Sequence, residues 1–381
     1  MKSFIILSIL VYISCVSGRA QGEVVSLPFT IEKSVPFISD DLDFRGINQA
    51  INRQLKSFNQ QNLNKKIQIG GTTIKLAKLK KSLESFQHLV NQYLECELEK
   101  KQCLKKLNTE VASKFNAYRP QILEWEKGYK TNESFFTAYY SPDLNGSFKK
   151  TKKFSRPIYG MPSGKDALLT RDEIDFEGKL KGKNLELFYV DESVYNLWLL
   201  HVQGGGRVKV KNENGKVINY YLSYVGTNKK EFNMLYHYMR ERGMLSEENS
   251  GVPAQREYFE NNPQDHREIL KVCPSYVFFK VTKTEPVGVQ NIPLTENRSL
   301  ATDYRRIKQY GMLVLVKSKK PTSVENTNDK ISFSRIFINQ DTGGAIKGNG
   351  RADMYFGYGK YAEASAYSVA DLGEQYFLIL K

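Results

Sequence analysis

Residues 337–359 read FINQDTGGAIKGNGRADMYFGYG, and this stretch carries more information than any other part of the chain. Two aspartates, Asp341 and Asp353, lie twelve residues apart, with four glycines and few large side chains between them. Glycine adopts positive φ angles and lets other groups approach the backbone closely. We therefore expect a shaped loop that holds carboxylates beside a groove, although a surface turn with solvated aspartates would have the same composition.

Length and composition indicate a globular protein of two or three domains. The 381 residues are long enough to bury a core, and 40% hydrophobic with 12% aromatic residues argue against a disordered chain. The formal net charge of +15 favours a polyanionic partner, such as nucleic acid, an anionic membrane or a cell-wall polymer. Lysine runs before residue 155 supply much of this charge, and such runs are also typical of solvated faces.

The first residues, 1–20, are expected to form a signal peptide. A positively charged start precedes a ten-residue, mainly apolar stretch from Phe4 to Ile13, which is too short to span a bilayer. Cys15 follows as a candidate for lipid attachment, and we prefer this lipoprotein interpretation to plain cleavage near Gly18 or Ala20. The sequence therefore predicts an exported protein with a lipid anchor at Cys15.

Cysteine and histidine are too few and too scattered to predict a metal site. The sequence has four of each, none at metal-ligand spacing, and no phosphate- or dinucleotide-binding motif, so we expect neither metal nor cofactor. Cys96 and Cys103 would lie about 10 Å apart along an unbroken helix, which exceeds disulfide reach. A bridge between them would require the helix to bend near residues 99–101.

Hydrophobic spacing divides the chain into a helical N-terminal part and a β-rich remainder. A helix or helical hairpin is predicted from an N-cap at Thr72 or Thr73 to Pro120. Its apolar residues follow 3-4 spacing at Leu76, Leu79, Leu83, Phe86, Val90 and Tyr93.

After Pro120 the pattern alternates, with several strands expected within 184–226 and helices at 228–245 and 254–271. Asn214-Gly215 predicts a hairpin turn. Many short strands with few helices favour a β-barrel architecture.

Seven segments, dispersed in order along the chain, resemble the membrane-bound lytic transglycosylase A family, whose C-terminal part is the three-aspartate (3D) domain. These segments are FTAYYSP (136–142), RPIYGMP (156–162), LTRDEID (169–175), HVQGGGRVKV (201–210), PSYVFF (274–279), PLTENRSLATD (293–303) and QDTGGAIKGNGRADMYFGYG (340–359). Two departures stand out, because Gly205 replaces a family serine and Cys273-Pro274 replaces an asparagine-containing segment.

The resemblance implies a mainly β fold with an α-helical N-terminal extension over residues 21–114. A double-psi β-barrel catalytic domain would comprise residues 115–150 and 276–381. A second β-barrel, for substrate binding, would be inserted at residues 151–275, with the active groove between the two barrels.

The resemblance also implies a chemistry. Family members cut the β-1,4 bond between N-acetylmuramic acid and N-acetylglucosamine in peptidoglycan, and the C6 hydroxyl closes on C1 to leave a 1,6-anhydro end. Because the substrate supplies the nucleophile, one carboxyl can act first as acid and then as base. That carboxyl must start protonated, so its pKa must be raised. By its position in the motif, the resemblance implies that Asp353 is this acid/base. Asp341 would lie beside it and oppose the ionisation of Asp353.

The resemblance also implies which residues bind the glycan. They are Thr137, Tyr139, Tyr140, Gln203, Gly204, Gly205, Asp303 and Lys347. Strand alternation places Tyr139 and Tyr140 on opposite faces, so only one can line the groove. Asp303 could equally be a structural turn residue, and Lys347 a solvated side chain.

The expected partner is a peptidoglycan glycan strand, bound by a monomer that takes no nucleic acid. The expected location is the periplasm, with anchorage to the outer membrane. Two alternatives stay open at this point. One is a non-catalytic, peptidoglycan-binding lipoprotein, because a shared fold does not ensure a shared function. The other is a conventional hydrolase that uses both Asp341 and Asp353.

Overall fold

The computed structural model describes residues 25–122, 133–191, 193–344 and 346–381. The predicted signal peptide and Cys15 lie outside these residues, so export and lipid attachment stay predictions. Among the residues described, no helix is both long and apolar enough to cross a membrane.

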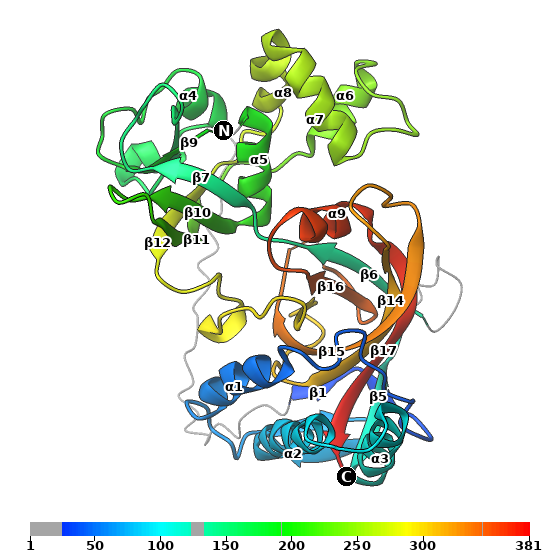
Figure 1. Cartoon of the computed structure of the whole chain (residues 1–381). Helices are drawn as coiled ribbons and strands as arrows, with labels where there is room; N and C mark the ends of the chain where they lie inside the picture. The colour runs from blue at the N-terminus through cyan, green and yellow to red at the C-terminus, as the bar shows by residue number, and fades with distance from the viewer. Residues whose placement is uncertain (1–24, 123–132, 192, 345) are drawn as a thin grey trace, which may run out of the picture.

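Six strands close into a barrel that carries both aspartates of the glycine-rich stretch (Figure 1). Their order is β14-β15-β13-β16-β6-β17, and pairing of β17 with β14 closes the circuit. The strands are β6 (Ser134–Tyr139), β13 (Ser299–Thr302), β14 (Leu313–Pro321), β15 (Lys330–Asp341), β16 (Arg351–Tyr355) and β17 (Ala370–Leu380). Continuous apolar runs in β14 and β17 form the centre of the core, as expected for strands buried on both faces. Helix α9 (Lys360–Ser368) packs on β6 and β14.

A second sheet of six strands forms a separate body above the barrel in Figure 1. Its order is β12-β11-β10-β7-β9-β8, and a bridge between Gly160 and Phe279 links the end of β8 to β12. The strands are β7 (Asp143–Ser147), β8 (Arg156–Tyr159), β9 (Glu186–Val190), β10 (Gly205–Lys211), β11 (Val217–Thr227) and β12 (Val277–Thr282).

The sequence-based domain boundaries are wrong by one strand at each end. Strand β7, expected in the catalytic barrel, pairs with β10, and β12 pairs with β11. The chain therefore changes sheets between Tyr139 and Asp143, not near residue 150. Alternation of apolar residues is the same in both sheets, so the pattern could not reveal the partner of either strand.

The part of the chain that holds the second sheet also contains helices, of which α5 packs on β10 and α7 packs on α5. They are α4 (Arg171–Asp175), α5 (Val194–Gln203), α6 (Leu235–Glu241), α7 (Val252–Asn261) and α8 (His266–Lys271), with short 3-10 turns at Gly164–Leu168 and Pro263–Asp265. A further 3-10 turn, Val289–Asn291, contacts β15 of the barrel. The expectation of several strands within 184–226 is confirmed by β9, β10 and β11, and helix α5 lies between β9 and β10. The Ser193 side chain caps it by accepting the Asn196 N–H, and Gly204 ends it at φ 73°. The predicted hairpin at Asn214-Gly215 is confirmed by the pairing of β10 with β11.

The N-terminal extension contains strands as well as helices. Its elements are β1 (Val25–Leu27), β2 (Phe29–Ile31), α1 (Ile47–Phe58), β3 (Lys66–Ile69), β4 (Thr72–Lys75), α2 (Leu76–Leu94) and α3 (Lys100–Lys114), followed by β5 (Phe115–Pro120). The predicted apolar face of α2 is confirmed, since its 3-4-spaced residues are buried. The predicted caps are wrong, because Thr72 and Thr73 lie in β4 and the helical part ends at Lys114, before β5.

The Cys96–Cys103 pair forms a disulfide across the corner between α2 and α3. Helix α2 ends at Leu94 and α3 begins at Lys100, so the helix is interrupted as a bridge would require. Cys273 is a buried free thiol, as expected for a small apolar residue.

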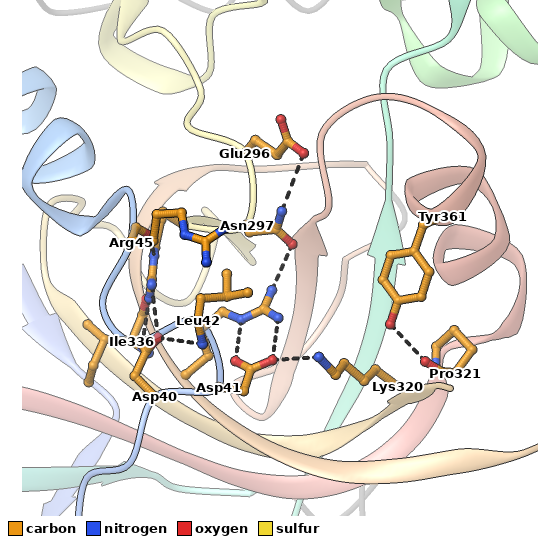
Figure 2. A network of polar contacts seen from close by, with 12 residues as sticks. Asp40, Asp41, Leu42, Arg45, Glu296, Asn297, Lys320, Pro321, Ile336 and Tyr361 are labelled. Atoms are coloured by element: carbon orange, nitrogen blue, oxygen red, sulfur yellow. Dashed lines mark hydrogen bonds and ion pairs between the residues drawn. The ribbon is translucent and has the colours of Figure 1, made fainter. Parts of the chain in front are cut away.

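The extension and the barrel share one core and are joined by ion pairs, of which one is fully buried (Figure 2). The Asp40 carboxylate accepts two hydrogen bonds from the Arg298 guanidinium, at 2.6 and 2.9 Å, and both side chains are fully buried. Asp41 accepts two from Arg335, at 2.8 and 2.7 Å, and one from Lys320 at 2.6 Å. Residues 25–114 are therefore an integral part of the barrel domain.

Candidate active site

Strand pairing brings the two aspartates of the glycine-rich stretch together. In the register of the barrel, Ala301 of β13 pairs with Asp341 on one side and with Asp353 on the other. Asp353 also pairs with Thr137 of β6. The eleven residues between the two aspartates thus lead from β15 to β16, on the other side of β13, so both aspartates flank Ala301.

Asp353 lies in the middle of β16, between two neighbouring strands. The Thr137 hydroxyl donates a hydrogen bond of 2.6 Å to its Oδ1 atom. Burial raises the pKa of Asp353, against the opposing effects of the Thr137 hydrogen bond and the Arg351 charge. Asp353 as a whole residue is partly exposed, so the group with the raised pKa lies near the surface of the barrel.

Asp341 lies at the end of β15 and is also partly open to solvent. The Tyr139 phenol donates a hydrogen bond of 2.7 Å to its Oδ2 atom. Burial raises the pKa of Asp341 to about 6, although hydrogen bonds from Tyr139 and the Thr342 N–H oppose this, and the charge of Asp353 adds to it. The site therefore has two carboxyl groups whose environments both favour the protonated form.

Thr137 and Tyr139, expected to contact sugar, use their hydroxyl groups on the two carboxylates. Both point to the same face of β6, because they are two residues apart. Tyr140 points to the other face, where its hydroxyl lies 2.7 Å from that of Tyr367 and 3.1 Å from Glu363. Tyr140 is buried in the core, so of the tyrosine pair only Tyr139 reaches the carboxylates.

Asp303 serves the backbone of the glycine-rich loop. Its Oδ2 accepts the Gly348 N–H at 2.8 Å, and its Oδ1 accepts the backbone N–H and Nε of Arg305. Burial opposes its ionisation, but these hydrogen bonds dominate and lower the pKa of Asp303. Asp303 is therefore an ionised, structural carboxylate, whereas Lys347 in the same loop is exposed.

The Gln203–Gly205 segment joins α5 to β10 in the second sheet. An added Cβ at Gly205 would lie 2.9 Å from the Leu222 carbonyl oxygen, so the backbone leaves no room there for a serine without a shift. Two residues further on, the Arg207 guanidinium lies 4.3 Å from the centre of the Tyr358 ring, just beyond β16. This contact joins the second sheet to the barrel.

Two residues of the site were missed from the sequence. Arg351 donates a hydrogen bond of 2.7 Å from Nη2 to the Thr137 hydroxyl oxygen. Gly288 packs against the other carboxylate, since an added Cβ there would lie 3.2 Å from Oδ1 of Asp341 and 2.4 Å from the Gln340 carbonyl oxygen. Alternation along β16 could have found Arg351, because it shares a face with Asp353. Nothing in the sequence marks Gly288.

No group of three metal-binding side chains occurs among the residues with described positions. The site thus offers carboxyl, hydroxyl and guanidinium groups, which suit proton transfer and hydrogen bonding to a polar substrate.

Comparison with protein families gives two matches in sequence order. The MltA specific insert domain matches residues 135–280, and the 3D domain matches residues 298–378. This chain belongs to the MltA family. The insert match includes β7 and most of β12 of the second sheet, and also most of β6 of the barrel.

Among curated proteins, two similar relatives carry the name membrane-bound lytic murein transglycosylase A. That of Vibrio cholerae serotype O1 is 32% identical over 241 residues, which is 63% of this chain and 63% of the relative. That of Escherichia coli K12 is 31% identical over 229 residues, 60% of each. The matched region thus spans under two thirds of these relatives.

Solved structures of MltA proteins have the same fold. E. coli MltA with bound chitohexaose superposes with a TM-score of 0.71 at 21% identity, covering 95% of this chain and 97% of that one. The membrane-bound lytic murein transglycosylase of Agrobacterium tumefaciens gives 0.66 at 23% identity, covering 92% and 98%. The mixed α/β architecture, with a six-stranded barrel and additional sheets, is therefore that of the MltA family.

Proposed function

We propose that this protein is a lytic transglycosylase that cleaves the bond between N-acetylmuramic acid and N-acetylglucosamine in peptidoglycan. The observation that carries the proposal is the pair of partly exposed carboxyls with raised pKa values, Asp353 and Asp341, in a barrel of the MltA family. The names of the curated relatives and the chitohexaose bound to the E. coli protein support a glycan substrate.

In the proposed reaction Asp353 acts in both steps. The protonated carboxyl gives its proton to the glycosidic oxygen as the bond from C1 to that oxygen breaks. The C6 hydroxyl of the same muramic sugar then attacks C1, and the Asp353 carboxylate takes the hydroxyl proton. The product has a 1,6-anhydro ring, no water is consumed, and Asp353 ends protonated again.

Asp341 is proposed to support this cycle by proximity. Its negative charge, when present, disfavours a second charge on Asp353 and favours the positive charge that develops at C1. Gln203, Gly204, Gly205 and Lys347 are proposed to contact the glycan. Thr137 and Tyr139 hydrogen-bond to Asp353 and Asp341, Asp303 holds the loop through the Gly348 N–H, and Tyr140 belongs to the core.

We further propose that the protein acts in the periplasm as a monomer anchored to the outer membrane by lipid at Cys15. The relatives are named as membrane-bound, and the Cys96–Cys103 disulfide suits an oxidising compartment.

The decisive experiment is mass spectrometry of fragments released from purified sacculi. We expect 1,6-anhydro ends from the wild-type protein and at least 1,000-fold less release from Asp353→Asn, because an amide keeps the shape but cannot transfer the proton. The exposed variant Asp329→Asn is the matched control. Reducing ends would identify the two-carboxylate hydrolase, and binding without cleavage would identify a non-catalytic wall protein.

A further inference from the structure

A line of three polar groups leads from Arg351 to the carboxyl of Asp353. Nη2 of Arg351 lies 2.7 Å from the Thr137 hydroxyl oxygen, and that oxygen lies 2.6 Å from Oδ1 of Asp353. All three residues project from one face, because Arg351 and Asp353 are two apart on β16 and Thr137 pairs with Asp353 in the parallel register.

The guanidinium itself is held in place. Its Nη1 donates a hydrogen bond of 2.6 Å to the Ala352 carbonyl oxygen. Its central carbon lies 5.1 Å from the centre of the Phe135 ring, the residue that pairs with Arg351 across the strands. A planar group fixed by a backbone carbonyl and an aromatic ring presents its remaining N–H groups in a defined direction.

The chemistry of the groups gives this line a direction. Arginine has only donors, so the Thr137 oxygen must accept from Arg351. A hydroxyl has a single hydrogen, which the neighbouring positive charge repels and which the Asp353 oxygen at 2.6 Å attracts. Oδ1 of Asp353 then accepts this hydrogen, and a proton on a neutral Asp353 is best placed on Oδ2.

We propose that Arg351 is a positioning residue of the reaction, which turns the Thr137 hydroxyl toward Oδ1 of Asp353 and so reserves Oδ2 for the proton that is transferred. The inference rests on the proposed function, since it names the oxygen that gives the proton to the glycosidic bond and later takes one from the C6 hydroxyl. It gives a role to Arg351, which reaches Asp353 through the Thr137 hydroxyl.

Three charged or titratable groups face Asp353 from the strands around it. Arg351 lies on its own strand, Tyr139 on β6 and Asp341 on β15, whereas β13 has no titratable side chain. Arg351 lowers the pKa of Asp353, so its removal should raise that pKa. Because the reaction needs a protonated Asp353, the basic limb of kcat/KM should then move to higher pH.

The test measures kcat and the pH profile for Arg351→Gln, Thr137→Val and the double variant. We expect each single change to move the basic limb upward by about 0.5–1 pH unit and to lower the plateau kcat by about 10–100-fold. The double variant should lose no more plateau kcat than Thr137→Val, because Arg351 acts through the hydroxyl. Thr137→Ser should restore the limb, and Arg267→Gln, an exposed arginine in another domain, should not move it.

Two results would overturn the inference. One is a basic limb of the kcat/KM profile that lies at the same pH in Arg351→Gln as in the wild type. The other is a double variant whose fold-loss of plateau kcat equals the product of the two single-variant losses. If Arg351→Gln does not fold, Arg351→Lys replaces it, with the limb expected near the wild-type pH and the plateau kcat still reduced.

Titration of the Asp353 carboxyl by ¹³C NMR, assigned by its loss in Asp353→Asn, needs no turnover. An unshifted Asp353 titration in Arg351→Gln would reject the inference even if the chain made no anhydro product. If the Asp353 titration shifts in Arg351→Gln but the wild-type protein makes no anhydro product, the proposed function is rejected and the inference about Arg351 is not.

Discussion

At the scale of residues, the site pairs two carboxyls with two hydroxyls. Thr137 and Tyr139, successive residues on one face of β6, each donate one hydrogen bond, to Asp353 and to Asp341 respectively. Each hydroxyl can keep this hydrogen bond in either protonation state of the carboxyl, because it can donate to a carboxylate oxygen or to the carbonyl oxygen of the acid. Burial raises both pKa values, so the folded site holds protons that the unfolded chain would release at the same pH.

This arrangement predicts that Asp341→Asn stabilises the protein at neutral pH. The Asp341 pKa is about 6 in the folded protein and 3.8 ordinarily, so the wild type loses stability as pH rises between these values. The amide does not titrate and can still accept from Tyr139. We expect equal stability near pH 4 and a gain on the order of 2–3 kcal/mol above pH 7, measured by urea unfolding.

The exposed variant Glu247→Gln is the control and should show no pH-dependent difference. The difference in unfolding free energy between the wild type and Asp341→Asn should change between pH 4 and pH 7.5. The same difference at both pH values would contradict the raised pKa of Asp341. The activity of Asp341→Asn should fall, but less completely than that of Asp353→Asn. Equal loss of activity in both folded variants would favour the two-carboxylate hydrolase.

At the scale of elements, the connection from β15 to β16 sets the positions of the aspartates. Asp303, just after β13, holds this loop by the Gly348 N–H, and Arg305 donates from Nη2 to the Ile346 carbonyl oxygen at 2.9 Å. The Thr342 hydroxyl donates to the Thr302 carbonyl oxygen at the start of the loop. The strand between the two aspartates therefore also anchors the segment that joins them.

We predict that Asp303→Ala loosens this loop. Loss of a buried carboxylate leaves the Gly348 N–H without its acceptor, at a cost of about 2–4 kcal/mol of unfolding free energy. The pKa of Asp303 is lowered, so its contribution is present above its ordinary pKa and disappears as pH falls through the folded value. The difference from wild type should thus shrink below pH 4.

Thermal unfolding across pH measures this effect, and hydrogen exchange at Gly348 localises it. Asp166→Ala, which removes an exposed ion pair, serves as the comparison and should cost under 1 kcal/mol. Unchanged exchange at Gly348 in Asp303→Ala would show that the carboxylate does not hold the loop.

At the scale of the whole molecule, the N-terminal extension forms one unit with the barrel. Residues from β1 to α3 share the barrel's hydrophobic core, and Asp40 and Asp41 reach the barrel arginines Arg298 and Arg335 (Figure 2). Arg335 continues the network with a hydrogen bond of 2.8 Å to Asn297 Oδ1. The extension and barrel should therefore unfold as one cooperative unit, while the insert has cores of its own.

Asp40→Ala is expected to destabilise this unit strongly. It leaves the fully buried Arg298 charge without its carboxylate, which costs about 3–5 kcal/mol. Changing both partners to apolar residues, as in Asp40→Leu with Arg298→Met, should cost less than the single change. Calorimetry checks both, and the exposed pair of Lys100 and Asp43 provides the control through Lys100→Ala. A change of less than 1 kcal/mol for Asp40→Ala would argue against an integral extension.

The amphipathic helix α2, the Asn214-Gly215 hairpin and the family were predictable from local sequence. Each depends on periodicity, turn chemistry or motif order within a short window. Helix α5 was not predicted, because its mostly apolar residues show no clear helical period and only Ser193 and Gly204 mark its ends.

The sequence by itself singled out Asp341 and Asp353 as candidates, because they stand in a glycine-rich stretch unlike an ordinary strand or helix. Only the tertiary structure decided what surrounds them. Thr137 meets Asp353 through pairing between strands that are about two hundred residues apart in sequence, and Arg351 contacts that same threonine. Gly288, from the segment between β12 and β13, packs against Asp341. Register and burial are properties of the closed barrel, and both the pKa of each carboxyl and the partner of each strand depend on them.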